Sequence, residues 1–409
     1  MTFQQFPSFG FMPQFFQDLI GMMSSSGPVN WSVAEQMAVS VIQKFEEGKN
    51  VDPNLRIDLE SIYRISYDRS VGLVEELGLR TDLRVLDKFE VITRSEWVQK
   101  SIKHLKPIFE NVVIPQPSQE FQKLGELSST ELDFSNPESM AAMFSRLLES
   151  VAPTMLAMQF GSLIGHLAET SFGNYDLLLP RENQHEVALA GSNVARFAEE
   201  WSLDLPQLEM YVVTREIFAT LVMTSPVLNA RFNSLLKSYV KGLQLDSDRL
   251  NQSFQDIDLS NPENLESMLM DPSRLVDFEP SDEHVEAEQN LKALVAAAEG
   301  LIQFLTNEVG KMTIGDSGEI HEALMRRRLE RGETEKFAET LFGFQMDQLS
   351  VDLGREFING VIERVGSSGV KYLLNLENGL PTASEIDAPG LWIARIQFDG
   401  AEFDQIDDL

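Results

Sequence analysis

One segment of the chain, Met210–Ala230, is almost wholly apolar and reads MYVVTREIFATLVMTSPVLNA. Its apolar residues cover every side of a helical wheel, which is typical of a helix buried on all faces rather than an amphipathic one. Two adjacent charged residues, Arg215 and Glu216, interrupt this pattern. Because charged side chains are rarely buried unless they are paired, the position of these two residues requires an explanation.

A second segment, Ala293–Asn307, shows the same pattern with a single carboxylate. It reads ALVAAAEGLIQFLTN, and Glu299 is its only charged residue. Two buried helices that carry three isolated charges indicate either a functional site or a buried cluster of ion pairs. The alternative is that these charges lie at the edge of the core and reach water.

Helix signals recur along the rest of the chain, and strand signals are few. Apolar residues at i, i+3 and i+4, caps of Ser, Thr or Asn, and Pro in the first turn predict the following helices: Ser32–Gly48, Leu55–Leu77, Thr93–His104, Asn136–Leu167, Ser192–Trp201, Pro206–Thr224 and Ser225–Gly242. Only Val85–Ile92 is predicted to be extended. We therefore predict a mainly α protein with few short strands and a helix content well above half.

Changes in composition along the chain predict four parts. Residues 1–30 form a Phe-rich arm, which packs on its own domain or contacts a partner. Residues 31–135 form an N-terminal helical unit that ends in a polar linker with two Pro residues at 113–135. Residues 136–397 form the main helical domain, and residues 398–409 form an acidic tail.

The charge of the chain excludes some classes of partner. The formal net charge is −31 over 409 residues, which argues against binding to nucleic acid or to an anionic membrane surface. The first 43 residues contain no Lys or Arg, so a secretory signal is not expected and we predict a cytoplasmic protein. The absence of Cys excludes disulfides, thiolate metal sites and Cys nucleophiles.

A dense basic cluster, MRRRLER at Met325–Arg331, stands out in this acidic chain. Its simplest interpretation is a helix face that meets carboxylates of its own fold or of a second copy. A homo-oligomer is therefore one expected partner arrangement, and a protein or peptide partner is the other.

Six segments carry a further pattern along nearly the whole chain. In order they are GPVNW (Gly27–Trp31), TRSEWV (Thr93–Val98), NVARFAEEW (Asn193–Trp201), YVVTREIF (Tyr211–Phe218), AAEGLIQFL (Ala297–Leu305) and LPTASEIDAPGLWIARI (Leu380–Ile396). Together they resemble a bacterial family of zincin-like metallopeptidases, also described as zinc-dependent metalloproteases or hydrolases. The resemblance implies a zincin-like helical core in residues 136–397 and a zinc cofactor in the active members.

The chain departs from this family where the metal would bind. In the typical member the central helix carries H-E-x-x-H, whose two His bind zinc while the Glu polarises a water molecule. Here the first His position is Arg215 and the second is Ala219, with Glu216 between them. The downstream Glu-Gly-His-x-Asp pattern is reduced to Glu299 and Gly300, followed by Leu301 and Gln303.

These replacements change the expected chemistry. Arg does not deprotonate to bind a cation and Ala has no donor atom, so a zinc site with His at these two positions is excluded. The five His of the chain, at positions 104, 166, 185, 284 and 321, show no pair at ligand spacing on one helix, and we expect each at the surface or the edge of the core. We therefore predict no bound metal and no cofactor.

Two functions follow from this pattern. The preferred hypothesis is a non-catalytic relative of the metallopeptidases that binds a partner. The alternative is an active hydrolase in which Glu216 is the general base and other groups complete the site. In the first case Arg215 replaces the metal cation, and the sequence predicts an ion pair between Arg215 and Glu299.

Overall fold

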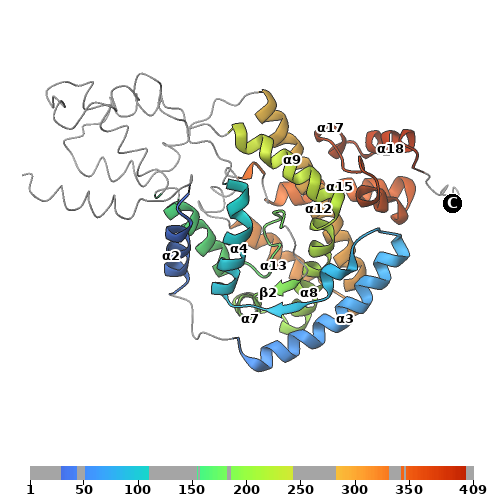
Figure 1. The fold of residues 1–409 in the computed structure, drawn as a ribbon. Helices are drawn as coiled ribbons and strands as arrows, with labels where there is room; N and C mark the ends of the chain where they lie inside the picture. The colour runs from blue at the N-terminus through green and yellow to red at the C-terminus, as the bar shows by residue number, and fades with distance from the viewer. Residues whose placement is uncertain are drawn as a thin grey trace, which may run out of the picture. The chain divides into compact units, whose positions relative to one another are not determined.

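The computed structural model describes residues 29–43, 51–109, 154, 157–181, 186–242, 282–330, 342–344 and 347–401. Helices dominate these residues, as Figure 1 shows. The prediction of a mainly α protein is confirmed. The predicted linker at 113–135, nearly all of the predicted Phe-rich arm and residues 402–409 of the predicted acidic tail lie outside the described residues.

Several helices in the C-terminal part of the chain had no predicted range, whereas the predicted helices lie close to their expected ranges wherever the described residues cover them. From the N-terminal side the helices are α2 (Trp31–Ile42), α3 (Pro53–Leu77), α4 (Arg94–Phe109), α7 (Gly191–Trp201), α8 (Leu205–Met223) and α9 (Pro226–Gly242). After them come α12 (Asp282–Thr313), α13 (Gly318–Leu329), α15 (Gln348–Val365), α16 (Tyr372–Asn375), α17 (Ala383–Ile386) and α18 (Pro389–Phe398). Within the described ranges, two 3₁₀ helices, η1 (Leu83–Leu86) and η3 (Ser367–Lys371), connect longer elements.

The described residues contain one small sheet of two parallel strands. Strand β1 (Phe89–Val91) pairs with β2 (Val187–Leu189), so that Glu90 lies opposite Ala188. The predicted extended piece Val85–Ile92 is only partly a strand, because its first residues belong to η1. Strand β2, which is short and fully buried, has no counterpart among the predicted elements.

The chain divides into two compact units that interleave along the sequence. One unit comprises Met1–Met37, Phe109–Ser162 and Leu243–Glu279, and the other comprises Ala38–Ile108, Leu163–Gly242 and Pro280–Leu409. Both predicted charged helices, α8 and α12, belong to the second unit. The polar contacts of their charged residues lie within that unit.

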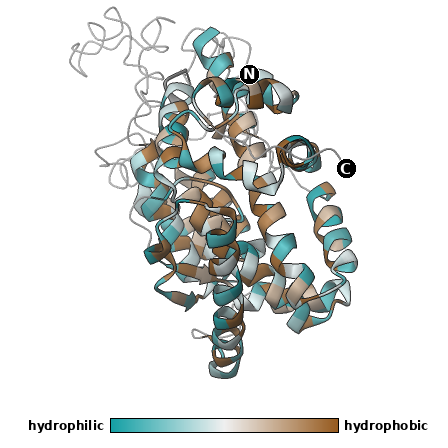
Figure 2. Ribbon diagram, turned by 90° about the vertical axis from the view of Figure 1, so that its right-hand side faces the viewer, coloured by the Kyte–Doolittle hydropathy of each residue, from teal (hydrophilic) through white to brown (hydrophobic). Residues whose placement is uncertain are grey.

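Helix α8 is the buried helix that the sequence predicts. Asp204 caps its N-terminus by accepting a hydrogen bond from the backbone N–H of Gln207, and Pro206 occupies the first turn. Nearly every residue from Tyr211 to Met223 is buried. Helices α3, α7, α9 and α12 pack around it. In Figure 2, hydrophobic residues accordingly dominate the inner helices, while hydrophilic residues alternate with them along the outer ones.

Two glycines allow α12 and α15 to approach each other closely. A Cβ atom at Gly300 would lie 2.3 Å from the carbonyl oxygen of Gly354, and one at Gly354 would lie 1.9 Å from that of Ala296. Both distances are far below van der Waals contact. The Glu299–Gly300 pair therefore combines a buried charge with a close helix crossing.

We expect Gly354→Ala to lower the free energy of unfolding by about 1–3 kcal/mol, because the added methyl group forces two helix backbones apart. Gly72→Ala is a matched control, since Gly72 lies inside α3 and a Cβ atom there would meet no neighbouring group within 4 Å. The control should be neutral or slightly stabilising through helix propensity. Urea denaturation of both variants measures the difference, and equal stabilities would contradict the tight crossing.

No single helix among the described residues is both long and apolar enough to span a membrane. The consecutive segments Leu205–Met223 and Pro226–Tyr239 pass that test only as a pair, with a bend of 74° between them.

Candidate functional site

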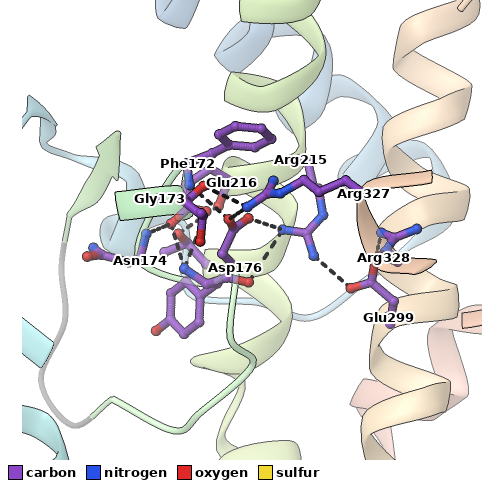
Figure 3. A network of polar contacts seen from close by, with 12 residues as sticks. Phe172, Gly173, Asn174, Asp176, Arg215, Glu216, Glu299, Arg327 and Arg328 are labelled. Atoms are coloured by element: carbon purple, nitrogen blue, oxygen red, sulfur yellow. Dashed lines mark hydrogen bonds and ion pairs between the residues drawn. The ribbon is translucent and has the colours of Figure 1, made fainter. Parts of the chain in front are cut away.

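Arg215 and Glu299 meet as the sequence predicts. The Nη2 atom of Arg215 on α8 donates to the Oε2 atom of Glu299 on α12, at 2.8 Å (Figure 3). The side chain of Arg215 is 13% exposed and that of Glu299 is 4% exposed. The predicted contact is thus confirmed. The alternative, in which these charges lie at the edge of the core and reach water, does not agree with the low exposure of the two side chains.

Two further arginines extend this pair into a network. Arg328 lies 3.3 Å from the second carboxylate oxygen of Glu299. Arg327 lies 3.2 Å from Asp176, and Asp176 is also 3.9 Å from Arg215. The network therefore contains three guanidinium groups and two carboxylates (Figure 3).

The basic cluster on α13 supplies two of these arginines. Arg327 and Arg328 point into the fold, where Arg327 lies over the ring of Phe172 at 4.2 Å from its centroid. Arg326, by contrast, pairs with Glu322 at the surface. The interpretation that this cluster meets carboxylates of its own fold is confirmed for the three residues.

Glu216 points in a different direction from Arg215 and is enclosed by backbone. One carboxylate oxygen accepts hydrogen bonds from the N–H groups of Asn174 at 2.7 Å and Tyr175 at 3.1 Å. A Cβ atom at Gly173 would lie 2.5 Å from this carboxylate, so the loop can reach Glu216 only with Gly at that position. Glu216 is 2% exposed.

The loop Phe172–Asp176 is itself fixed on both sides. Its Phe172 N–H donates to Asp176 at 2.8 Å, and the Phe172 carbonyl accepts from the N–H of Ala190 at 2.7 Å. The indole N–H of Trp97 donates to the carbonyl of Gly173 at 2.8 Å. The sheet and α4 thereby position the backbone amides that bind Glu216.

Burial and neighbouring charges change the ionisation of both α8 residues. Burial raises the pKa of Glu216 to about 7, although Arg215 and the Asn174 N–H favour the charged form. Burial acts to lower the pKa of Arg215, but Glu299 and Asp176 outweigh this effect and the net shift is upward. Arg215 is therefore a permanent cation, whereas Glu216 changes its charge near neutral pH.

A cavity of about 320 Å³ opens beside the network. Arg215, Arg327 and Arg328 line it, and so does Asp176, whereas Glu216 and Glu299 do not. Its walls also carry five aromatic side chains, those of Phe172, Phe197, Trp201, Tyr211 and Phe344. The cavity thus combines apolar surface with charged groups of both signs, as ligand sites usually do.

The residues of this site do not fit a zinc ion. The described part of the chain contains no group of three His, Asp, Glu or Cys side chains that could hold a metal. Glu299 accepts from two arginines, and Ala219, one turn beyond Arg215, is fully buried without a donor atom. The negative charge of Glu299 is balanced by the guanidinium groups of Arg215 and Arg328.

No histidine of the described residues belongs to the network, although the ring of His321 packs edge-on against Tyr211, which lines the cavity. His284 is buried and stacks on Tyr239, which corrects the expectation of a surface or core-edge position. His321 contacts Ser317 and Asn307, and His166 lies near Glu169 at the surface. His104 is partly buried on α4, and His185 lies outside the described residues.

Asp176 and the whole Phe172–Asp176 loop were not among the predicted site residues. The Gly173–Asn174 pair is a turn signal, but it does not show which distant side chain the turn contacts. The sequence indicated Arg327 and Arg328 only as members of the basic cluster and did not predict which carboxylates they contact.

Comparison with known proteins identifies a family and a structure with a similar fold. A family model for zincin-like metallopeptidases matches residues 29–393. A crystal structure of a candidate hydrolase with a novel fold from Chloroflexus aurantiacus has 18% sequence identity and a TM-score of 0.56. The match covers 91% of this chain and 100% of that one. No curated protein matches the sequence significantly. The extent of the family match shows that this chain belongs to the zincin-like metallopeptidases.

Proposed function

We propose that the chain is a non-catalytic member of its family that binds a peptide segment of a partner protein in the cavity beside Arg215. The observation that carries this proposal is the ion pair of Arg215 with Glu299. In an active relative, the family pattern implies a His at the Arg215 position. In this chain a permanent cation occupies the position and is neutralised within the protein.

The environment of Glu216 supports the same conclusion. A general base must reach the water molecule or substrate from which it takes a proton. Glu216 instead accepts hydrogen bonds from two backbone N–H groups, is almost fully buried and does not line the cavity. Its raised pKa is suitable for a general base, but its position is not.

The walls of the cavity favour a peptide over a highly charged ligand. Arg196, Arg215, Arg327 and Arg328 face Asp176, Glu200 and Glu330 around the same space, so positive and negative groups are nearly balanced. The aromatic side chains add apolar area that can accept a side chain of a peptide. We propose that backbone amides and carbonyls of the peptide meet the charged groups.

Binding can be tested with a fluorescently labelled peptide library and the full chain. We expect Phe197→Ala to weaken the selected peptides at least tenfold, because Phe197 lines the cavity. Arg355→Ala is the matched control, since Arg355 is a half-exposed residue of α15 that does not line the cavity. Equal binding by wild type and Phe197→Ala would place the peptide elsewhere and overturn this proposal.

The alternative function, an active hydrolase with Glu216 as base, makes a different prediction for the purified protein. It requires stoichiometric metal after purification without chelator and peptide cleavage that is lost in Glu216→Gln. Elemental analysis and a peptidase assay measure both quantities. Metal-dependent cleavage with this mutational loss would reject the non-catalytic proposal.

We further predict that the double variant Arg215→His, Ala219→His will not gain efficient peptidase activity with added zinc. Metal ligands need oriented neighbours, and the downstream positions Leu301 and Gln303 supply no ligand of the family type. Arg328 would also remain within 3.3 Å of Glu299 and compete with a metal for it. Efficient cleavage by the double variant would show that the supporting residues are intact.

A further inference from the structure

The Phe172–Asp176 loop has a second face, which lies away from the cavity. Phe172 and Asp176 line the cavity, whereas Asn174 does not, and Figure 3 shows its side chain directed away from Arg215. Arg181, a residue that follows the loop, contacts both Asn174 and Tyr175: its guanidinium donates to the backbone carbonyl of Asn174, and its Cζ atom lies 5.6 Å from the ring centroid of Tyr175. All three residues are buried, with Arg181 only 6% exposed.

These three side chains carry an unusual number of polar atoms without partners. Five buried atoms have no hydrogen-bond partner among the described residues: Asn174 Nδ2 and Oδ1, Tyr175 Oη, and Arg181 Nε and Nη1. Arg181 donates only from Nη2, to the carbonyl of Asn174 at 2.6 Å. Buried polar groups in folded proteins are normally satisfied, so a concentration of five on three neighbouring residues calls for a bound group.

The charge of Arg181 shows what kind of group would fit. No carboxylate among the described residues lies within ion-pair distance of its guanidinium, which is 5.6 Å from the ring centroid of Tyr175. Burial lowers the pKa of Arg181, and the more distant carboxylates of Glu216 and Glu186 offset this effect only in part. A buried cation without a counter-ion in contact is unfavourable. The immediate surroundings of Arg181 thus lack a negative group.

The unpartnered atoms are mostly donors. Two nitrogens of Arg181, the amide nitrogen of Asn174 and the hydroxyl of Tyr175 can all donate, and Asn174 Oδ1 is the single atom that can only accept. A cluster of donors around a buried cation is complementary to an anion. A water molecule could satisfy some of the atoms but would leave the charge unbalanced.

We propose that Arg181, Asn174 and Tyr175 form a buried binding site for a small anion, a halide or an oxyanion of the size of nitrate or acetate. The anion neutralises Arg181 and accepts hydrogen bonds from Asn174 and Tyr175. The backbone N–H groups of Asn174 and Tyr175 donate to Glu216. The anion binds the side chains of the same two residues, so it fixes the loop from the face opposite the cavity. This site is separate from the peptide-binding cavity and does not depend on that proposal.

Thermal unfolding of the full chain in different sodium salts tests the site. At constant ionic strength, replacement of gluconate by chloride, nitrate or acetate should raise the melting temperature saturably, by about 2–4 °C once the anion greatly exceeds its Kd. The anion with the largest effect identifies whether the site prefers a halide or an oxyanion. Equal melting temperatures in all four salts would overturn the proposal.

Variants show whether the effect arises at this site. Arg181→Met should abolish the anion-dependent shift and Tyr175→Phe should reduce it, whereas Arg355→Met, which changes a half-exposed arginine, should leave it unchanged. If Arg181→Met does not fold, Tyr175→Phe decides, because it removes only the hydroxyl. If Arg181→Met does not fold and Tyr175→Phe still shows the full anion-dependent rise in melting temperature, the proposed contacts are wrong.

Crystals grown in sodium bromide give the direct test. An anomalous peak within hydrogen-bond distance of Arg181 Nε or Nη1 is the expected result. A second crystal, grown in sodium nitrate, tests for an oxyanion. If the bromide crystal shows ordered water and no anomalous peak in this position, and the nitrate crystal shows no nitrate there, water alone satisfies these atoms and the anion site is rejected.

Discussion

Replacement of Arg215 by alanine is expected to lower the free energy of unfolding by about 3–5 kcal/mol. The substitution leaves the carboxylate of Glu299, which is 4% exposed, without its shortest ion pair. It also removes one of the two cations near Asp176, which keeps Arg327 at 3.2 Å. Arg328 remains 3.3 Å from Glu299, so we expect a loss toward the lower end of this range.

Urea denaturation of wild type and variant measures this loss, and a double-mutant cycle assigns its cause. In the background Glu299→Gln, Arg215→Ala should cost much less, because the carboxylate of Glu299 is no longer present to lose its partner. Arg326→Ala is the matched control, since its pair with Glu322 lies at the surface and should contribute no more than about 0.5 kcal/mol. A cost below about 1 kcal/mol for Arg215→Ala would show that the ion pair is not essential to the core.

The helices were predictable because their signals are local. Pro206 in the first turn and the apolar residues on every side of α8 all lie within the helix itself. Composition and periodicity indicated that the charges on the two core helices require partners. The specific contact between Arg215 and Glu299 was predictable from the family resemblance, which implies that both positions face the same place.

The partners of Glu216 were not predictable, because backbone N–H groups supply them. Any residue type except Pro can donate such a bond, so Asn174 and Tyr175 give no signal in the sequence. Only Gly173 reflects the contact, since a side chain there would collide with the carboxylate. The short strand β2 escaped prediction for a related reason, because a run of three buried residues fits a helix equally well.

The role of the α13 arginines depends on the rotation of a helix about its axis. Arg326, Arg327 and Arg328 are adjacent in sequence, yet the first points to the surface and the other two reach Asp176 and Glu299. Packing between distant parts of the chain decides this rotation. The sequence could therefore predict a basic helix in contact with carboxylates but not which arginine meets which carboxylate.

The second large effect expected is a change of stability with pH that originates at Glu216. Burial raises the pKa of this residue in the folded protein to about 7, from an ordinary value of 4.5. The folded state thus binds the proton of Glu216 more tightly than the unfolded state does. Protonated Glu216 therefore stabilises the folded state fully below pH ~4.5, and this contribution is lost as the pH rises through about 7. The full difference corresponds to about 3 kcal/mol.

Glu216→Gln isolates this contribution, because the amide is neutral at every pH and its oxygen can still accept from the Asn174 N–H. Burial raises the pKa of Glu209 to about 7 as well, but this group is present in both proteins and cancels in the comparison. Between pH ~5.5 and ~8.5, we expect wild type to lose about 2 kcal/mol of unfolding free energy relative to Glu216→Gln. The absolute stability of the variant does not affect the test, since only the pH dependence of the difference is measured. Parallel pH profiles of the two proteins would mean that Glu216 is ionised throughout this range, and that the two N–H groups and Arg215 outweigh the effect of burial.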